Sequence, residues 1–475
     1  MEPMDMGAMV AKVLPEVALV AGGVVVLLFA LFASRRVQPW AAAIAAAATM
    51  IAAVLSWIAL DSPQELTFTD SYAADNVTGW ARLIVLVATL ATIALSAPWF
   101  RSDPRQGEYY TLLLFSALGA IMLAGATDLI QLILALLLSS VTGYVLVAFH
   151  RRSRVAAEAG IKYFLLGALP NSGMLIGVAF LYGLAGGATY TALRSGLGTS
   201  SPALVAGVAL VVVALAFKAG AVPAHAWVPD VAQGAPAPVA AFVTAAPKVG
   251  GLIALARFVV ALPPDAIGWR PLIAVLAAVT MTLGNLAALW QDDVRRLLGW
   301  SAVSQTGYGL MALVALGRAE LAVPALLVFL VAYVLGNLAA FGVVIELRGR
   351  TERVSYAGLA RARPWMAAAL VVSFLSFIGI PPVAGFAAKL LLFAVAIEAG
   401  YAWLAVVAVV NTVWSVFYYA RVIAPMYFEP LPAPVPVLGH WSAGATLACG
   451  TGVIAAGVAA EPLVSAFRSA LLLSG

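Results

Sequence analysis

The chain has 475 residues, of which 64% are hydrophobic and only 10% are charged. Soluble domains carry about 25% charged residues, so this composition excludes an ordinary soluble protein. The net charge of +5 does not indicate nucleic-acid binding, because the arginines fall in short clusters between apolar runs. A single cysteine, Cys449, excludes an internal disulfide and any cysteine-ligated cluster.

Apolar runs of roughly 20 residues recur along the whole chain, and each is long enough to cross a bilayer as a helix. We therefore predict an all-α, polytopic membrane protein of about fourteen transmembrane helices. The expected spans in chain order are 12–34, 39–60, 79–99, 108–126, 128–149, 160–184, 202–222, 236–261, 270–290, 297–316, 321–346, 366–395, 401–427 and 441–470.

Arginine clusters occupy alternate loops, and cytoplasmic loops carry an excess of Lys and Arg. The first cluster, Arg35-Arg36, follows the first expected span and puts that loop in the cytoplasm. Four later clusters fall on the same side when the spans are counted onward, at 101–105, 150–154, 295–296 and 348–363. We expect a multi-pass protein of the cell's inner (plasma) membrane, with the N- and C-termini outside.

Two expected spans are interrupted by proline and glycine. The span 202–222 ends in KAGAVP, and the span 366–395 contains GIPPVAG. Proline removes a backbone donor and breaks a helix, and paired broken helices are typical of transporters built from two inverted repeats. We expect a single integral membrane domain over 1–475, divided into three helices in 1–105, a first repeat in 106–263, a second repeat in 264–430 and a last helix in 431–475.

Three of the five lysines, Lys218, Lys248 and Lys389, lie inside apolar stretches. An arginine stays charged at any accessible pH, whereas a buried lysine can gain and lose a proton. A single lysine could snorkel to the headgroups or support carbonyls exposed at a helix break. Each charge at mid-membrane costs about 2.5–3.5 kcal/mol on insertion scales, so the set of three favours a hydrated path for protons.

His225 follows Pro223 just beyond the Lys218 span, and histidine is the natural proton shuttle at neutral pH. We include His225 in the expected relay, with support of the broken helix as the alternative. No histidine set fits haem ligation, so we predict no redox centre, cofactor or metal in this chain. Other polar residues near the breaks, expected to hold water or to bond between helices, are Asp230, Gln233, Ser304, Gln305, Ser373, Ser376, Asn411 and Thr412. Packing roles are expected for Tyr163, Tyr308 and Tyr333.

Several sequence blocks carry a family resemblance. The most specific runs from Lys218 to Lys248, KAGAVPAHAWVPDVAQGAPAPVAAFVTAAPK, and others are EAGIKYFLLGAL, DDVRRLLGWSAVSQTGYGLMAL and GIPPVAGFAAKLLLF. Over most of its length the chain resembles the antiporter-like membrane subunits of respiratory complex I, most closely subunit N of bacterial NADH-quinone oxidoreductase. The resemblance implies a translocase subunit whose proton relay consists of Lys218, Lys248 and Lys389.

The same resemblance implies how this chain would act within a complex. NADH, FMN, iron–sulfur clusters and quinone would be bound by partner subunits, and electron transfer there would drive protons through this one. The expected partners are other membrane subunits, the lipid bilayer and protons, with no nucleic acid.

The chain departs from the family pattern at one position that matters. The family has a glutamate on the fifth span that pairs with the first relay lysine, and here Leu137 occupies that position. The family's histidine in the tenth span is replaced by Gln305. Two alternatives therefore stay open beside the complex I subunit: a subunit of a cation/proton antiporter or membrane-bound hydrogenase, which share the fold, and a divergent structural subunit that has lost conduction.

Overall fold

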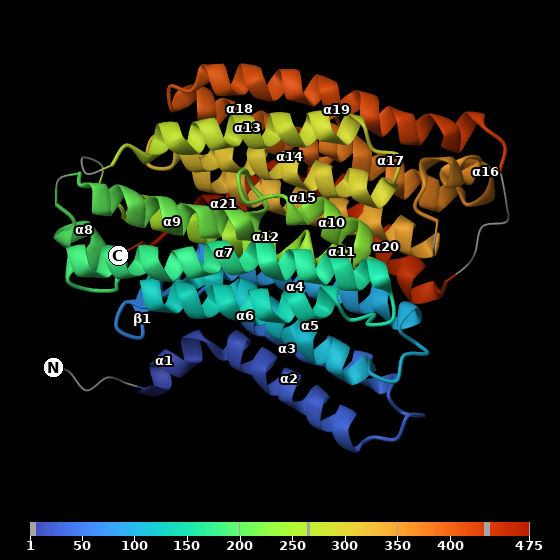
Figure 1. Cartoon of the computed structure of the whole chain (residues 1–475), viewed down its shortest axis with the longest axis horizontal. Helices are drawn as coiled ribbons and strands as arrows, with labels where there is room; N and C mark the ends of the chain where they lie inside the picture. Colours follow the sequence, from blue (N-terminus) through green and yellow to red (C-terminus); the bar gives the residue numbers. More distant parts are fainter. Residues whose placement is uncertain (1–5, 199, 264–266, 349, 432–437, 475) are drawn as a thin grey trace.

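The computed structural model describes residues 6–198, 200–263, 267–348, 350–431 and 438–474. It is an elongated bundle of long, roughly parallel helices (Figure 1). The elements of the first half are α1 Met6–Lys12, α2 Leu14–Phe32, α3 Trp40–Ala59, β1 Glu65–Thr67, β2 Tyr72–Ala74, α4 Asn76–Trp99, α5 Gln106–Gly125, α6 Leu129–Val147, α7 Arg154–Ala185, α8 Tyr190–Gly196, α9 Pro202–Ala219, α10 Trp227–Gly234, α11 Ala237–Val243 and α12 Ala246–Ala261. Those of the second half are α13 Trp269–Leu289, α14 Val294–Ala315, α15 Ala322–Glu346, the 3-10 turn Arg353–Tyr356, α16 Leu359–Ala362, α17 Pro364–Ile378, α18 Ala384–Glu398, α19 Ala402–Phe428, α20 His440–Val458 and α21 Ala460–Arg468.

The predicted polytopic helical fold is confirmed. In the described part of the chain, 12 helical segments are long and apolar enough to cross a membrane. Two expected spans are not among them: α14, which is rich in polar residues, and the pair α17–α18, which is split into shorter helices. Each of the fourteen expected ranges overlaps a helix or a broken pair of helices.

Both predicted breaks are present and have the same local design. Helix α9 ends at Ala219 and α17 ends at Ile378, and in each case the next residue is a glycine with positive φ. Gly220 (φ 79°) and Gly379 (φ 93°) adopt the left-handed conformation that terminates helices, which costs glycine no Cβ clash. A proline follows three positions after each glycine and prevents the helix from resuming at once.

Two further interruptions were not predicted, and proline explains both. Helix α11 stops at Val243 before Pro247, and α20 stops at Val458 before Pro462. Each proline lies four residues after the last helical residue, so the carbonyl there has no N–H to accept from. The first of these breaks lies directly before Lys248 and shapes its surroundings.

The same helix contact occurs in both halves of the bundle. A Cβ added to Gly119 on α5 would lie 2.5 Å from the backbone nitrogen of Ser139 on α6, and one added to Gly284 on α13 would lie 2.5 Å from that of Ser304 on α14. This match supports two repeats. Their expected boundaries, near residues 264 and 431, border stretches outside the described residues.

Loops that carry arginine clusters gather at one end of the bundle. At one end the arginine-bearing loops contact each other, with Arg105 donating to Phe149 O and Arg348 to Trp99 O. At the other end lie both termini (Figure 1): Lys12 pairs with Glu65 in the β1–β2 hairpin, and Gln64 beside it donates to Ser469 O. An even number of crossings follows from this arrangement.

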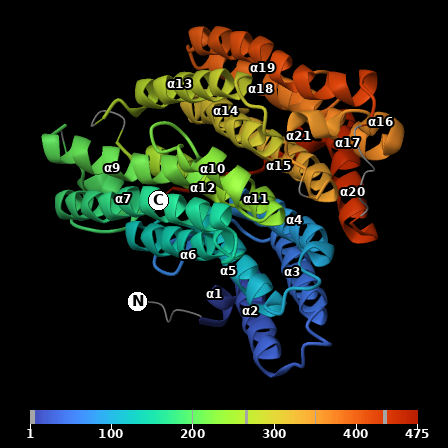
Figure 2. The ribbon, with the colours of Figure 1, turned by 45° about the vertical axis from the view of Figure 1, so that its right-hand side comes forward.

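Figure 2 shows α2 and α3 at one edge of the bundle, α6, α7 and α9 in the middle and α18 and α19 at the opposite edge, whereas the later helix α20 packs against α15 and α4. Helix α14 lies deep in this bundle, and all of its residues except Arg296 and Trp300 are buried. A helix so enclosed touches little lipid, which explains why it can be polar.

Candidate functional site

The three predicted relay lysines are all enclosed by protein. Lys218 is 1% exposed, Lys248 3% and Lys389 4%. None of them extends to the bundle ends or toward the outer surface, so the snorkelling alternative is wrong. Each ammonium group must therefore find its hydrogen-bond partners inside the bundle.

Lys218 lies in the last turn of α9, directly before the first break. Its Nζ lies 3.4 Å from Ser140 Oγ on α6, a long hydrogen bond to a neutral group. Aromatic rings cover the neighbouring end of the helix, with Tyr163 stacked on Trp227 at 4.4 Å and Trp227 Nε1 donating to Phe217 O. This environment offers Lys218 hydrogen bonding and no counter-charge.

Lys248 lies in the first turn of α12, just after the α11–α12 break. Its Nζ donates to Ala302 O on α14 at 2.5 Å and lies 4.4 Å from the centre of the Tyr333 ring. Tyr333 also donates through its hydroxyl to Thr244 O, a carbonyl freed by that break. A carbonyl dipole and an aromatic face both stabilise a cation without neutralising it.

Lys389 lies in α18, after the second break. Its Nζ donates to Ile378 O at 3.0 Å and to Thr412 Oγ1 at 3.3 Å, and it sits 3.9 Å from the Tyr308 ring centre. Ile378 is the last residue of α17, so this lysine caps the carbonyl end of the first half of the broken helix.

The three lysines share one electrostatic arrangement. In the described part of the chain, the lysines that form ion pairs are Lys12 and Lys162, and the three buried ammonium groups have no carboxylate within 4.0 Å. Neutral oxygens and aromatic faces hold them instead. A proton held this way can leave without stranding a buried carboxylate.

The sequence assigned Tyr308 and Tyr333 to packing, and this was incomplete because the two rings also lie against the buried ammonium groups of the predicted relay lysines. It also missed Ser140. A tyrosine on a neighbouring span, one or two helical turns from a helix break, is a sequence signal for such a ring contact. It does not identify which lysine the ring covers.

Two contacts link the lysines into a row. Gly251, one turn after Lys248 on α12, lies so close to α9 that an added Cβ would be 3.3 Å from Lys218 Cβ. A small cavity of about 10 Å³ lies between the surroundings of Lys248, represented by Tyr333, and Lys389 itself. It is lined by Gln305, Phe329, Ala332, Tyr333, Ser376, Phe377, Gly385 and Lys389. A volume of about 10–15 Å³ is enough for one water molecule.

His225 is not brought into this row. It lies beyond the first break, where its ring contacts Trp300 at 5.7 Å between centroids. Among the described residues, its Nδ1 has no hydrogen-bond partner. Its place in the relay stays a prediction.

Leu137 is not positioned as the family resemblance suggested. It is 37% exposed and lies on the outward side of α6, whereas Ser140, one turn later, contacts Lys218. We expect Leu137→Glu to leave proton pumping unchanged and Ser140→Asp to lower it at least about tenfold, because a carboxylate there would hold the proton on Lys218. Proton flux in the reconstituted complex checks this, and a larger effect of Leu137→Glu would contradict it.

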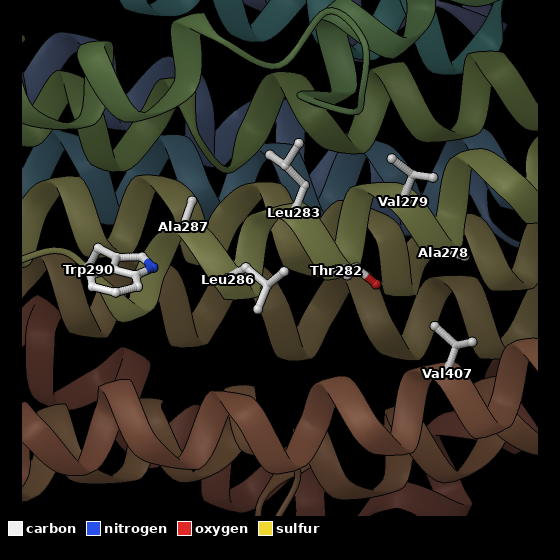
Figure 3. A pocket seen from close by; sticks show the side chains of 8 residues that line it. All are labelled: Ala278, Val279, Thr282, Leu283, Leu286, Ala287, Trp290 and Val407. Atoms are coloured by element: carbon white, nitrogen blue, oxygen red, sulfur yellow. The ribbon is translucent and has the colours of Figure 1, made fainter.

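An open groove of about 590 Å³ lies on the outer face of α13 against α19 (Figure 3). Seven of its eight lining residues are apolar, and Thr282 is the exception. A groove without ionisable lining suits lipid chains and not a proton relay. Among the described residues, no group of three or more His, Cys, Asp or Glu side chains could hold a metal ion.

Comparison with known proteins agrees with this geometry. Residues 126–415 match the family described as NADH:quinone oxidoreductase/Mrp antiporter, TM. NADH-quinone oxidoreductase subunit N of Mycobacterium sp. (strain JLS) is 44% identical over 94% of this chain and 96% of its own. A chain of respiratory complex I from Thermus thermophilus is 31% identical, covers 97% of this chain and 100% of its own, and superposes with a TM-score of 0.82. A chain of the Mrp complex from Dietzia sp. has a TM-score of 0.84 at 21% identity, covering 98% of this chain and 97% of its own, which shows a shared fold.

Proposed function

The chain belongs to the NADH:quinone oxidoreductase/Mrp antiporter transmembrane family, as an antiporter-like membrane subunit of the complex I type, and we propose that its three buried lysines relay protons across the membrane. The observation that carries this proposal is the row of three enclosed ammonium groups that are held by neutral partners. Neutral partners supply hydrogen bonds to each ammonium group without raising its proton affinity as strongly as a paired carboxylate would.

Transfer runs along the row from Lys218 to Lys248 and then to Lys389. Protonation of one lysine disfavours protonation of the next, since like charges repel in a low-dielectric interior. A proton that arrives at Lys218 therefore promotes proton release from the lysines further along the row. Between Lys248 and Lys389, a water in the small cavity beside Gln305 and Tyr333 bridges the gap that the side chains do not span.

The energy for this transfer comes from outside the chain. NADH, FMN, iron–sulfur clusters and quinone are bound by partner subunits of the complex, and their electron transfer changes the charge or packing at the edge of this subunit. The protein lies in the bacterial inner membrane with the arginine-bearing loops in the cytoplasm and both termini outside. The gathering of those loops at one end of the bundle supports this orientation.

Substitution of Lys248 by methionine tests the relay. Methionine keeps much of the side chain's length without a titratable group, so we expect the proton-to-electron ratio of the complex to fall while the complex still assembles. The measurement is proton pumping per NADH oxidised in proteoliposomes. Lys12→Met is the matched control, because Lys12 pairs with Glu65 at the end of the bundle. This substitution should leave the proton-to-electron ratio unchanged. An unchanged ratio for Lys248→Met would refute the relay.

One alternative has an observation in its favour. Lys218 faces a serine and no carboxylate, so this subunit could serve mainly as a structural spacer without conduction. The same experiment separates the two functions, because a spacer would tolerate Lys248→Met with no loss of pumped protons.

A further inference from the structure

Helix α14 is held by close backbone contacts with α10 and α13. A Cβ added to Gly299 would lie 2.7 Å from Pro229 Cα on α10, and one added to Gly307 would lie 2.5 Å from Met281 N on α13. Such contacts leave no room for sliding, so α14 behaves as a rigid rod at the centre of the bundle.

Two adjacent residues of this rod hold one break each. Thr306 Oγ1 donates to Ala219 O at 2.8 Å, and Ala219 is the last residue of α9. Gln305 Nε2 donates to Phe377 O at 3.1 Å, in the last turn of α17. The breaks deprive both carbonyls of their helical donors, so α14 supplies the missing hydrogen bonds at both sites.

The Thr306 hydroxyl has a second acceptor, Ala302 O, at 3.0 Å. This is the same carbonyl that accepts from Lys248 Nζ. A hydroxyl carries a single proton to donate. When the Lys248 ammonium donates to Ala302 O, the Thr306 hydroxyl donates preferentially to Ala219 O. When that ammonium withdraws or loses its charge, Ala302 O competes more strongly for the hydrogen bond from Thr306.

We propose that Thr306 and Gln305 are positioning residues that connect the state of Lys248 to both helix breaks. Thr306 passes a change at Lys248 to the end of α9, where Lys218 lies in the last turn. Gln305 is the residue before Thr306 on the same rigid helix. It donates to the carbonyl end of α17 and lines the cavity shared with Lys389. This inference rests on the proposed relay and adds the residues that keep its two halves in step.

The test is Thr306→Val in the intact complex, with Thr306→Ser as the matched control. Valine keeps the branched shape and removes the only donor, whereas serine keeps the donor. We expect Thr306→Val to lower the proton-to-electron ratio, and to raise amide hydrogen exchange about tenfold at residues 220–222 as the hydrogen bond to Ala219 O is lost. Exchange should also rise at the second break, which Thr306 does not contact, at the amides of Gly379, Ile380 and Val383. Thr306→Ser should restore all three readouts.

Other outcomes separate the two proposals. If Thr306→Val keeps the full ratio, or if exchange changes only at the first break, the coupling role is refuted even when Lys248→Met abolishes pumping. If Lys248→Met keeps the full ratio, the relay itself fails. Should Thr306→Val not assemble, Gln305→Met gives the reciprocal test. Exchange must rise at both breaks, and a rise confined to the amides of the second break overturns the coupling.

Discussion

Asp75→Ala is expected to lower the free energy of unfolding by about 3–5 kcal/mol, because it strands a buried guanidinium. The side chains of Asp75 and Arg257 are both 0% exposed and are joined by two hydrogen bonds of 2.7 Å. Arg257 also donates to Ala124 O and Thr78 Oγ1, so its position cannot adjust toward water. This cluster joins α4, α5 and α12, and its loss should loosen the packing of these three helices against one another.

The Asp75 carboxylate accepts two further hydrogen bonds that the alanine substitution would also remove. It accepts from Thr78 N as the N-cap of α4, and from Leu473 N in the C-terminal segment. Thermal unfolding of the purified protein in detergent measures the combined loss. Asp103→Ala is the matched control, since the partly exposed pair of Asp103 with Arg105 should contribute about 0–1 kcal/mol.

A second substitution checks the cause of the destabilisation. Asp75→Ala combined with Arg257→Met removes both charges, so it should recover part of the stability lost in Asp75→Ala alone. If the double variant is less stable than the single one by the full cost of another core substitution, the unpaired charge is not the reason for the loss.

The sequence was sufficient for features that depend on local composition. Spans follow from runs of apolar residues, and both predicted breaks follow from glycine and proline, whose backbone constraints act within a few residues. The burial of Lys218, Lys248 and Lys389 followed from the same runs. The breaks before Lys248 and after Val458 could have been predicted as well, since Pro247 and Pro462 act by the same mechanism.

Partners that are backbone atoms could not be predicted. Lys248 donates to Ala302 O and Lys389 to Ile378 O, and every residue offers a carbonyl, so nothing marks these two in the sequence. The pair of Asp75 with Arg257 joins residues far apart in the chain, which no local pattern connects.

The position that the family resemblance gives for the glutamate shows a second reason why the sequence does not predict the site. Matching Leu137 to a family glutamate fixes its place in an alignment, but each residue turns an α-helix by about 100°. Leu137 and Ser140 are three residues apart and so differ by only about 60° around the helix axis, yet Leu137 is 37% exposed while Ser140 contacts Lys218. Whether a helical residue reaches the site depends on how the helix is rotated against its neighbours, which packing determines.

Gly385→Ala is expected to cost about 3 kcal/mol or more, at the upper end of overpacking substitutions. Gly385 is the second residue of α18, and an added Cβ would lie 1.7 Å from Ser376 O and 2.7 Å from Ser376 Oγ. The obstructing carbonyl belongs to α17, so relief requires the two halves of the broken helix to separate. Gly385 N also donates to Ser376 Oγ, and that hydrogen bond would be lost on separation.

The functional effect of Gly385→Ala should follow from Lys389, which lies one turn further along α18. Moving α18 away from α17 withdraws the Lys389 ammonium from Ile378 O, so we expect the proton-to-electron ratio to fall together with the unfolding temperature. Gly444→Ala is the matched control: no atom lies within 4 Å of its added Cβ, and alanine within α20 should stabilise the helix by about 0.5–1 kcal/mol. The prediction fails if the Gly385→Ala complex unfolds at the same temperature as the unaltered complex and pumps at the full ratio. That result would mean that the two halves of the broken helix can separate at no cost, and that their contact does not set the position of Lys389.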